Sequence, residues 1–208
     1  LVGLNGSGKS TLIKLLLNMY KPDSGDIHVF GRPYEEYKSG FIRSKMAVFF
    51  QDFFIFHQTM RENVAVGDIG NIDNEAIIND AIKKGGAVKI VKQLKNGLDT
   101  LLGKFMDKSG VELSGGERQR VGVSRTHMNN KDVLIFDEPA SMLDPIAEME
   151  QFINIKSMLD GRTAILISHR VGFARMADKI IMLNDGKIAH MGTHEELMSQ
   201  NGLYAHFF

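Results

Sequence analysis

Three glycines, a lysine and a serine stand close together near the start of the sequence, at residues 3–10 (GLNGSGKS). Their spacing matches G-x-x-x-x-G-K-[ST], the phosphate-binding P-loop, in which glycines let backbone N–H groups turn toward an anion at a helix N-terminus. Lys9 then reaches the outer phosphates of a nucleoside triphosphate, and the Ser10 hydroxyl can bind Mg²⁺. The residues expected around the phosphates are Asn5, Gly6, Ser7, Gly8, Lys9, Ser10 and Thr11.

Two acidic residues follow an apolar run at residues 133–136 (VLIF). Such a run is typical of a buried parallel strand, which would deliver Asp137 and Glu138 to the carboxyl end of the sheet, where α/β proteins bind ligands. Asp137 leaves the strand first and suits Mg²⁺, bound directly or through water. Glu138 can act as the general base that polarises an attacking water.

A histidine, His169, stands at the end of another strand-like run, residues 165–168 (ILIS). From this position its imidazole can donate a hydrogen bond to a γ-phosphate. Taken without its context, a single histidine is weak evidence, because a structural role is the commoner one.

The segment of residues 113–120 (LSGGERQR) contains a helix start that can also bind an anion. Ser114 and Glu117 have the S-x-x-E spacing of a capping box, which by itself predicts only the beginning of a helix. The consecutive Gly115 and Gly116 leave backbone N–H groups uncovered, so that a phosphate can approach. One chain has no use for this second phosphate site unless the site faces the nucleotide of another chain. We therefore expect a head-to-tail dimer.

Strand-like and helix-like segments alternate along the chain, which predicts an α/β fold with a largely parallel sheet flanked by helices. The predicted strands are residues 27–30, 46–50, 133–136, 164–167 and 179–183, and a turn at 184–187 leads into a last strand at 188–191. The predicted helices are residues 11–20, a helix-rich stretch over 60–94, residues 116–128, helices between the strands at 133–136, 164–167 and 179–183, and a C-terminal helix that begins near Thr193, with Glu196 as its capping-box partner. We expect one domain over residues 1–208, with a helical subdomain inserted at about 59–130.

The composition excludes several classes of protein. The 208 residues are 43% hydrophobic and 24% charged, as in one ordinary globular domain. Lys plus Arg and Asp plus Glu each total 25, so no overall positive charge attracts nucleic acid, and we expect no nucleic-acid partner. The absence of cysteine excludes disulfides and a cysteine nucleophile. The longest apolar run, residues 46–50, is far shorter than the roughly 18 residues of a membrane span.

The LSGGE stretch resembles the signature motif of the ATP-binding cassette (ABC) family, and further motifs extend the resemblance over residues 1–208. Gln51 resembles the Q-loop glutamine, which in the family links the Mg²⁺ and attacking-water region to a transmembrane partner. Residues 141–144 resemble the D-loop, in which Asp144 reaches across the dimer. His169 resembles the switch histidine. The resemblance implies a P-loop NTPase fold, with ATP and Mg²⁺ as ligands. It assigns catalysis to Glu138, His169 and Gln51, the metal to Ser10, Gln51 and Asp137, and nucleotide contacts also to Ser114, Gly115, Gly116 and Asp144.

Within the family, residues 49–56, 97–103 and 192–197 look like those of exporter-type cassettes, and residues 102–113 are similar to cassettes fused to membrane domains. The resemblance therefore implies ATP hydrolysis in a head-to-tail dimer with a second cassette, identical or different. It also implies export of a peptide, lipid or drug-like substrate through a transmembrane domain fused upstream. The cassette would then lie at the cytoplasmic face of the cell membrane.

The sequence departs from the family pattern at several positions. Glu117 stands where glutamine is commonest, and Ala140 and Met142 stand where threonine and alanine are usual, but none of them is a phosphate, metal or base ligand. Gly122 replaces the usual alanine inside a helix, which costs about 1 kcal/mol of helix stability. The aromatic residue that stacks on adenine in the family would lie upstream of Leu1. Because a P-loop needs a preceding strand, we expect that at least most of one strand is missing from the sequence.

Other interpretations remain open at this level. An ABC-type ATPase that acts on DNA or ribosomes would carry coiled-coil insertions or basic arms, and neither is visible. A regulatory cassette without hydrolysis is disfavoured by Glu138 and His169. Phe53, Phe54 and Phe56 follow Gln51 in a segment that family members use to contact the membrane domain. For these aromatic residues, packing between two lobes is the alternative to an interface.

Overall fold

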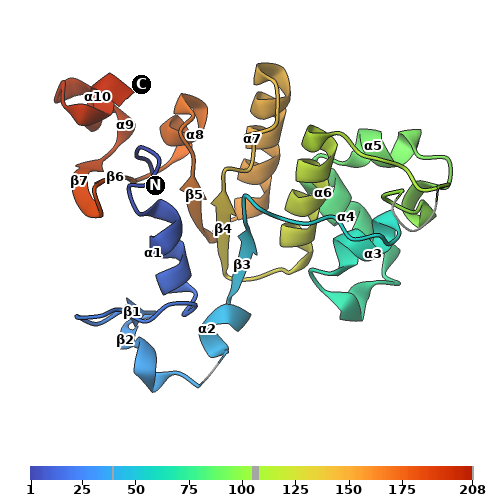
Figure 1. The fold of residues 1–208 in the computed structure, drawn as a ribbon, viewed down its shortest axis with the longest axis horizontal. Helices are drawn as coiled ribbons and strands as arrows, with labels where there is room; N and C mark the ends of the chain where they lie inside the picture. Colours follow the sequence, from blue (N-terminus) through green and yellow to red (C-terminus); the bar gives the residue numbers. More distant parts are fainter. Residues whose placement is uncertain (39, 105–107, 208) are drawn as a thin grey trace. The chain divides into compact units, whose positions relative to one another are not determined.

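The computed structural model describes residues 1–38, 40–104 and 108–207 (Figure 1). These residues form two compact units. The first unit comprises Leu1–Met46, Lys131–Glu138 and Ala164–Phe208. The second comprises Ala47–Asn130 and Pro139–Thr163. Within the described ranges, no helix has the length and apolar character that crossing a lipid bilayer requires.

The first unit contains the glycine loop together with several short strands and helices. Its elements are α1 (Lys9–Leu16), β1 (His28–Val29), β2 (Arg32–Pro33), η1 (Tyr34–Glu36), α2 (Phe41–Ser44), β4 (Val133–Asp137), α8 (Val171–Met176), β6 (Ile180–Asn184), β7 (Lys187–Gly192), α9 (His194–Ser199) and α10 (Leu203–Phe207). β5 (Thr163–Ile167) belongs to this unit apart from its first residue, and β3 (Met46–Phe49) belongs to it only through Met46.

The strands of the first unit supply hydrogen-bond partners to the backbone next to the glycine loop. β4 is buried along its whole length, as its unbroken apolar sequence predicts, and it pairs with β5. The N–H of Glu138 donates to the carbonyl of Ile167 at 2.9 Å. Val2 runs parallel to β6: its N–H donates to Ile181 at 3.0 Å, and its carbonyl accepts from Leu183 at 2.9 Å. The backbone at Val2, which leads into the glycine loop, is therefore held by hydrogen bonds to β6.

The turn signal at residues 184–187 correctly predicts a hairpin. β6 and β7 pair antiparallel, and Asp185 and Gly186 between them both have the positive φ of a tight hairpin turn. The capping box predicted from Thr193 and Glu196 is confirmed, because both of its hydrogen bonds are present at the start of α9.

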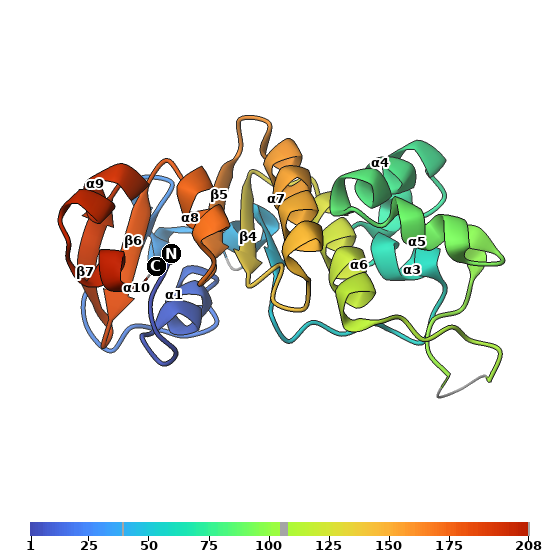
Figure 2. The same ribbon diagram turned by 90° about the horizontal axis from the view of Figure 1, so that it is seen from above.

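The second unit is built mainly from helices (Figure 2). Its elements are α3 (Met60–Ala65), η2 (Ile69–Asn71), α4 (Glu75–Gly85), α5 (Val88–Gln93), η3 (Gly97–Asp99), α6 (Gly115–Met128) and α7 (Pro145–Leu159). α4 packs against α6 and α7, and α3 packs against α6. The core between these helices consists of buried aliphatic side chains, among them Met60, Val64, Ile78, Leu102 and Val121.

The sequence placed most elements correctly but missed their exact ends and several short ones. α1 begins at Lys9 rather than Thr11, directly after its N-cap Gly8, and it ends at Leu16. Its C-cap is Leu17, which is followed by Asn18 with the positive φ that commonly ends a helix. β2, α2 and α10 were not predicted, since elements of two to five residues contain too little of a repeat to be recognised.

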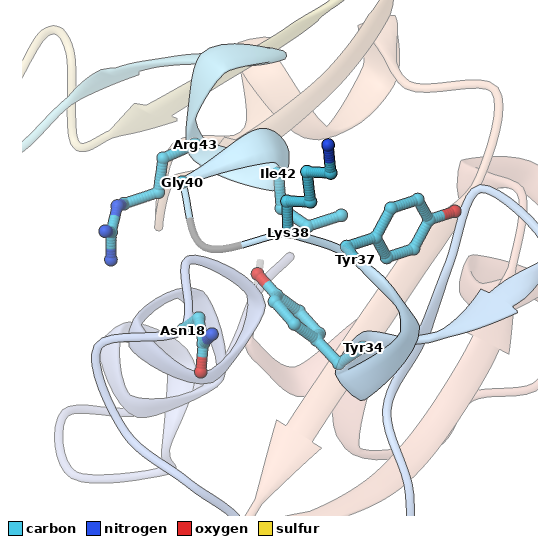
Figure 3. A pocket seen from close by; sticks show the side chains of 7 residues that line it. All are labelled: Asn18, Tyr34, Tyr37, Lys38, Gly40, Ile42 and Arg43. Atoms are coloured by element: carbon cyan, nitrogen blue, oxygen red, sulfur yellow. The ribbon is translucent and has the colours of Figure 1, made fainter.

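A small cavity in the first unit is too small for a substrate (Figure 3). Its volume is about 20 Å³, which is room for about one water molecule. Tyr34 lines it, and the hydroxyl of this residue donates to the carbonyl of Leu16. Burial raises the pKa of Tyr34, so the phenol stays protonated and continues to donate.

One buried side chain of the second unit makes no hydrogen bond to the residues that the structure describes. Gln151, in the middle of α7, is fully buried, and neither the oxygen nor the nitrogen of its amide has a partner among the described residues. Gln119 is an equally buried glutamine of the same unit, but its amide bonds to Ser141 at 3.2 Å and to the N–H of Met142 at 3.2 Å. The two residues therefore form a matched pair for mutation.

We expect Gln151→Met to raise the free energy of unfolding by about 1–3 kcal/mol, because it removes two buried polar groups that have no partner among the described residues, without changing the size of the side chain much. Gln119→Met should lower the free energy of unfolding by a similar amount, since it leaves a backbone N–H unpaired. Urea titrations of the two variants test this. A loss of stability in Gln151→Met would mean that its amide is satisfied.

Candidate functional site

The glycine loop of the first unit has the backbone conformation that an anion-binding nest requires. Gly6 and Gly8 have φ values of 81° and 99°, in the left-handed region that favours glycine. α1 starts directly after Gly8, so that its free N–H groups face the loop. The ammonium of Lys9 donates to the carbonyls of Gly3 and Leu4 at 2.8 and 2.9 Å, which holds this charge over the loop.

The residues of this loop fit a triphosphate. Ser7 is 4% exposed, and its hydroxyl has no partner among the described residues, although a buried hydroxyl is normally hydrogen-bonded. A Cβ built on Gly6 would meet nothing within 4 Å, so the space above the loop is open. An anion seated there would supply the acceptor that the Ser7 hydroxyl lacks.

A serine and a carboxylate next to the loop fit a small divalent cation. The hydroxyl of Ser10 lies 3.4 Å from Oδ2 of Asp137, at the end of β4. Neighbouring oxygens of an octahedral Mg²⁺ site lie about 3 Å apart, since each is about 2.1 Å from the ion. The described residues contain no group of three or more His, Cys, Asp or Glu that could hold a metal. Two protein oxygens with phosphates and water completing the shell are usual for Mg²⁺.

Glu138 and His169 form a pair at the ends of β4 and β5. Nδ1 of His169 lies 3.0 Å from Oε1 of Glu138. The carboxylate is 12% exposed and the imidazole 52% exposed, so that one side of the pair is open to solvent. Glu138 has a φ of 52°, an unfavourable backbone conformation for glutamate. Such strain persists where the surroundings impose it and is concentrated at functional sites.

In the second unit, the 113–120 segment begins α6 as predicted. Ser114 accepts from the N–H of Glu117 at 3.3 Å, and the carboxylate of Glu117 accepts from the N–H of Ser114 at 2.8 Å. This is the predicted capping box, confirmed in both directions. Ser114 and Gly115 are exposed, so this helix N-terminus is accessible to an anion.

The residues at 141–144 pack on these glycines. A Cβ on Gly115 would lie 3.1 Å from Sδ of Met142, and a Cβ on Gly116 would lie 2.8 Å from Cδ2 of Leu143. The amide of Gln119 also bonds to the N–H of Met142. The start of α6 and this loop therefore form one packed block, and a side chain at either glycine would push the ends of the Met142 or Leu143 side chains aside.

Asp144 is the N-cap of α7. Its Oδ1 accepts from the N–H groups of Ile146 and Ala147, both at 3.0 Å. The N–H of Ala147, followed by that of Ile146, holds the pKa of Asp144 below its usual value, so the carboxylate is charged at neutral pH. The carboxylate is thus fixed at the start of α7, and Asp144 is exposed to solvent.

A groove of about 700 Å³ lies in the second unit, lined by Gln51, Asp52, Phe53, Phe54, Ile55, His57, Leu102, Gly103, Val111, Glu112, Leu113, Gly115, Arg118 and Met142. Phe53 packs on Phe49, with ring centroids 4.9 Å apart. Phe54 and Phe56 instead point outward and are 60% and 40% exposed. The three aromatic residues therefore do not share one core, and two of them form an accessible apolar surface.

Gly122 lies where the rings of this segment approach α6. A Cβ on Gly122 would lie 2.6 Å from Cε2 of Phe49 and 3.0 Å from Cδ2 of Phe53. Phe49 is only 2% exposed and cannot turn away freely. Gly122 therefore lowers the stability of α6, as expected from the sequence, but its lack of a side chain makes room for the rings of Phe49 and Phe53.

We expect Gly122→Ala to lower the free energy of unfolding by about 1–3 kcal/mol, because overpacking outweighs the gain in helix propensity. Gly172→Ala is the matched control: this glycine also lies in a helix, α8, but a Cβ there meets nothing within 4 Å. The control should gain up to about 1 kcal/mol. Thermal melts of both variants measure the difference, and equal shifts would contradict this explanation of Gly122.

The first unit thus brings together the glycine loop, Asp137, Glu138 and His169. Gln51, Ser114, Gly115, Gly116 and Asp144 belong to the second unit. Sequence reasoning missed Gln119, whose amide holds the 141–144 loop. Its position within the 113–120 motif was the only available signal, because its partners Ser141 and Met142 are distant in sequence.

The glycine loop, with Asp137, Glu138 and His169 at the ends of β4 and β5, defines an α/β protein of the P-loop class. The sequence profile of the ABC transporter family matches residues 1–141. The chain belongs to the ABC transporter family.

Several relatives match almost the whole chain. The ATP-dependent lipid A-core flippase of Alcanivorax borkumensis is 37% identical over 208 residues, which is 100% of this chain and 35% of the flippase. The leukotoxin translocation ATP-binding protein LktB of Mannheimia haemolytica is 38% identical over 207 residues, 99% of this chain and 28% of LktB. A bacterial Atm1-family ABC exporter, solved with ATP bound, superposes with a TM-score of 0.90 at 33% identity. It is covered over 35% of its length, and this chain over 99%. The chain therefore spans about a third of the length of its relatives.

Proposed function

We propose that this chain binds ATP with Mg²⁺ on the glycine loop of its first unit and hydrolyses it. The observation that carries the proposal is the convergence of Ser10, Asp137, Glu138 and His169 around this loop. Phosphate would lie against the N–H groups at the start of α1, with Lys9 on the outer phosphates. Mg²⁺, held by Ser10 and Asp137, would neutralise the charge that develops on the phosphates; Gln51 is the further candidate ligand.

The chemistry assigned to Glu138 is that of a general base. The oxygen of a water attacks the γ-phosphorus, and the bond from this phosphorus to the bridging oxygen of ADP breaks. The carboxylate of Glu138 accepts the proton of the water. His169 holds that carboxylate through Nδ1, and its other ring nitrogen can face the γ-phosphate. ADP and inorganic phosphate then leave.

We also propose that Ser114, Gly115, Gly116 and Asp144 act on the nucleotide of a second cassette. Support comes from the open helix N-terminus at Ser114, a second anion site in a chain that already has one. The block of α6 and the 141–144 loop would present these groups together. The partner cassette is a copy of this chain or a different one.

The names of the relatives, a lipid A-core flippase and a leukotoxin translocation protein, support a role in export. We propose that ATP hydrolysis drives export of a peptide, lipid or drug-like substrate through a transmembrane domain, with the cassette at the cytoplasmic face of the membrane. The exposed rings of Phe54 and Phe56 beside the groove of the second unit are suitable for contact with that domain.

ATP binding is tested by Lys9→Ala. We expect this variant to bind ATP about 10–100-fold more weakly, because it loses a charge-assisted hydrogen bond to phosphate of about 1.5–3 kcal/mol. Lys14→Ala, at a lysine of the same helix that lies over the ring of Tyr20, is the control and should bind normally. Titration with a fluorescent ATP analogue measures both affinities. Unchanged affinity in Lys9→Ala would place the phosphates elsewhere.

A further inference from the structure

Three polar side chains from the last three helices of the first unit are joined by hydrogen bonds. Nε of Arg175, on α8, donates to Nε2 of His194, on α9, at 3.3 Å. Nδ1 of His194 lies 2.8 Å from the hydroxyl oxygen of Tyr204, on α10. We call these three residues the C-terminal cluster. It connects α8 to both helices that follow it in the chain.

The contacts of His194 determine which of its ring nitrogens carries the proton. A guanidinium has donors only, so Nε2 of His194 accepts from Arg175. The proton of the imidazole is then on Nδ1, where it donates to the oxygen of Tyr204. His194 is 8% exposed and Tyr204 0% exposed, and their rings meet edge to face with centroids 5.8 Å apart. His194 therefore has one tautomer and one ring orientation.

α8 depends on other elements for its position. It has six residues, which is too few for a helix to be stable by itself. Ala174, on its buried side, belongs to a core that also contains Leu197 of α9 and Tyr204 of α10. The bond from Arg175 to His194 adds a directional contact to this packing. α9 and α10 therefore help to set the position of α8.

α8 also follows directly after the candidate catalytic histidine (Figure 1). His169 lies two residues after Ile167, the end of β5, and two residues before Val171, the start of α8. β5 is fixed, because the carbonyl of Ile167 accepts from the N–H of Glu138 at 2.9 Å. A shift of α8 can be absorbed only within residues 168–170. It would therefore change the contact of 3.0 Å between His169 and Glu138.

We propose that His194 is a positioning residue for ATP hydrolysis. By accepting from Arg175 it holds α8, and α8 in turn holds His169 against the carboxylate of the proposed general base. This inference rests on the proposed function, which gives His169 its role. A displacement of about 1 Å can lower the rate of an enzyme about 100-fold, because the reacting groups lose their alignment. The C-terminal cluster acts on the rate and not on ATP binding, since none of its residues belongs to the glycine loop.

Substitutions that remove single hydrogen bonds but keep the packing test this proposal in the purified protein. His194→Phe keeps an aromatic ring and removes both nitrogens. Arg175→Met keeps the aliphatic stem and removes the donor, at an exposed residue outside the core. The matched controls are His206→Phe on α10 and Arg32→Met on β2, which replace an exposed histidine and an exposed arginine of the same unit.

We expect His194→Phe and Arg175→Met each to lower the maximal rate of hydrolysis about 10–100-fold, with the ATP concentration at half-maximal rate changed by less than about twofold. His194→Gln should recover most of the rate, because its amide can both accept and donate. The two controls should hydrolyse ATP at the wild-type rate. Wild-type rates in His194→Phe and Arg175→Met, or an equal loss in the controls, overturn the proposal.

A merely structural role of the C-terminal cluster would give a different result. The core beside it contains Val2, which leads into the glycine loop. Loosening of this core would weaken ATP binding and lower the melting temperature together with the rate. Such a combined loss in Arg175→Met, or the absence of rescue by His194→Gln, overturns the proposal.

Combination with His169→Ala separates failure of this inference from failure of the proposed function. Because the C-terminal cluster acts through His169, His194→Phe should cause no further loss of rate in a chain that already carries His169→Ala. Single-turnover release of radiolabelled phosphate measures these low rates. A further loss as large as in the wild type overturns the inference and leaves the role of His169 intact. Wild-type hydrolysis by His169→Ala itself would contradict the proposed function, and the inference with it.

Discussion

Glutamine in place of Glu138 is expected to lower steady-state ATP hydrolysis by about 10²–10⁴-fold while ATP stays bound. The side chain keeps its shape and its contact distance to His169, but a neutral amide cannot accept the proton of the attacking water. Phosphate release by the purified protein measures the rate, and equilibrium binding of radiolabelled ATP measures the affinity. The large effect is confined to the rate because the phosphate-binding groups of the loop are unchanged.

The control for this variant is Glu35→Gln. Glu35 is an exposed glutamate of the first unit, in η1, and its substitution should leave hydrolysis unchanged. Near-normal turnover in Glu138→Gln would show that another group takes the proton. Loss of ATP binding would show that Glu138 supports the loop rather than the chemistry.

Two inactive chains are expected to restore each other. Lys9→Ala removes the phosphate lysine, and Gly115→Asp puts a carboxylate into the proposed trans site. The new side chain would also displace Met142, whose Sδ lies 3.1 Å from the position of the added Cβ. In a mixed dimer, the altered loop of one chain and the altered α6 of the other chain meet in the same composite site. A mixed dimer then retains one intact site, formed by the loop of one chain and α6 of the other.

Mixing equal amounts of the two chains should recover about a quarter of the wild-type activity. Half of the randomly formed dimers are mixed, and each mixed dimer has one intact site out of two. Each chain alone should be inactive. The two chains would carry different affinity tags, so that capture through one and detection of the other shows that mixed dimers form. Inactive mixed dimers would mean that Gly115 serves its own chain.

The parts of the site that the sequence predicted are local in the chain. The glycine loop, the acids after β4 and the capping box at Ser114 each depend on residues within about ten positions of one another, so spacing alone defines them. The hairpin after β6 is of the same kind, because a two-residue turn needs only Asp185 and Gly186.

The parts that the sequence did not predict depend on contacts between distant residues. The residues next to Gln119 in sequence do not indicate that its amide accepts a hydrogen bond from Met142. Nor does the sequence around Gly122 indicate that the ring of Phe49 packs against this glycine. The Gln151 amide, which has no partner in the described part of the chain, was not predicted for the same reason, since helix periodicity places a residue on one side of a helix but does not supply its partners. Spacing indicated that Glu138 follows β4, but not the positive φ at which the fold holds it.

The strained backbone at Glu138 connects the proposed hydrolysis of ATP with the stability of the fold. A glycine at this position would adopt a φ of 52° without steric cost, whereas glutamate pays about 1–3 kcal/mol for it. Selection for thermal resistance alone would therefore favour replacing the very carboxylate that the proposed chemistry needs. Stabilised variants of such a chain would tend to be inactive ones, so a screen for robustness has to be coupled to a measurement of turnover.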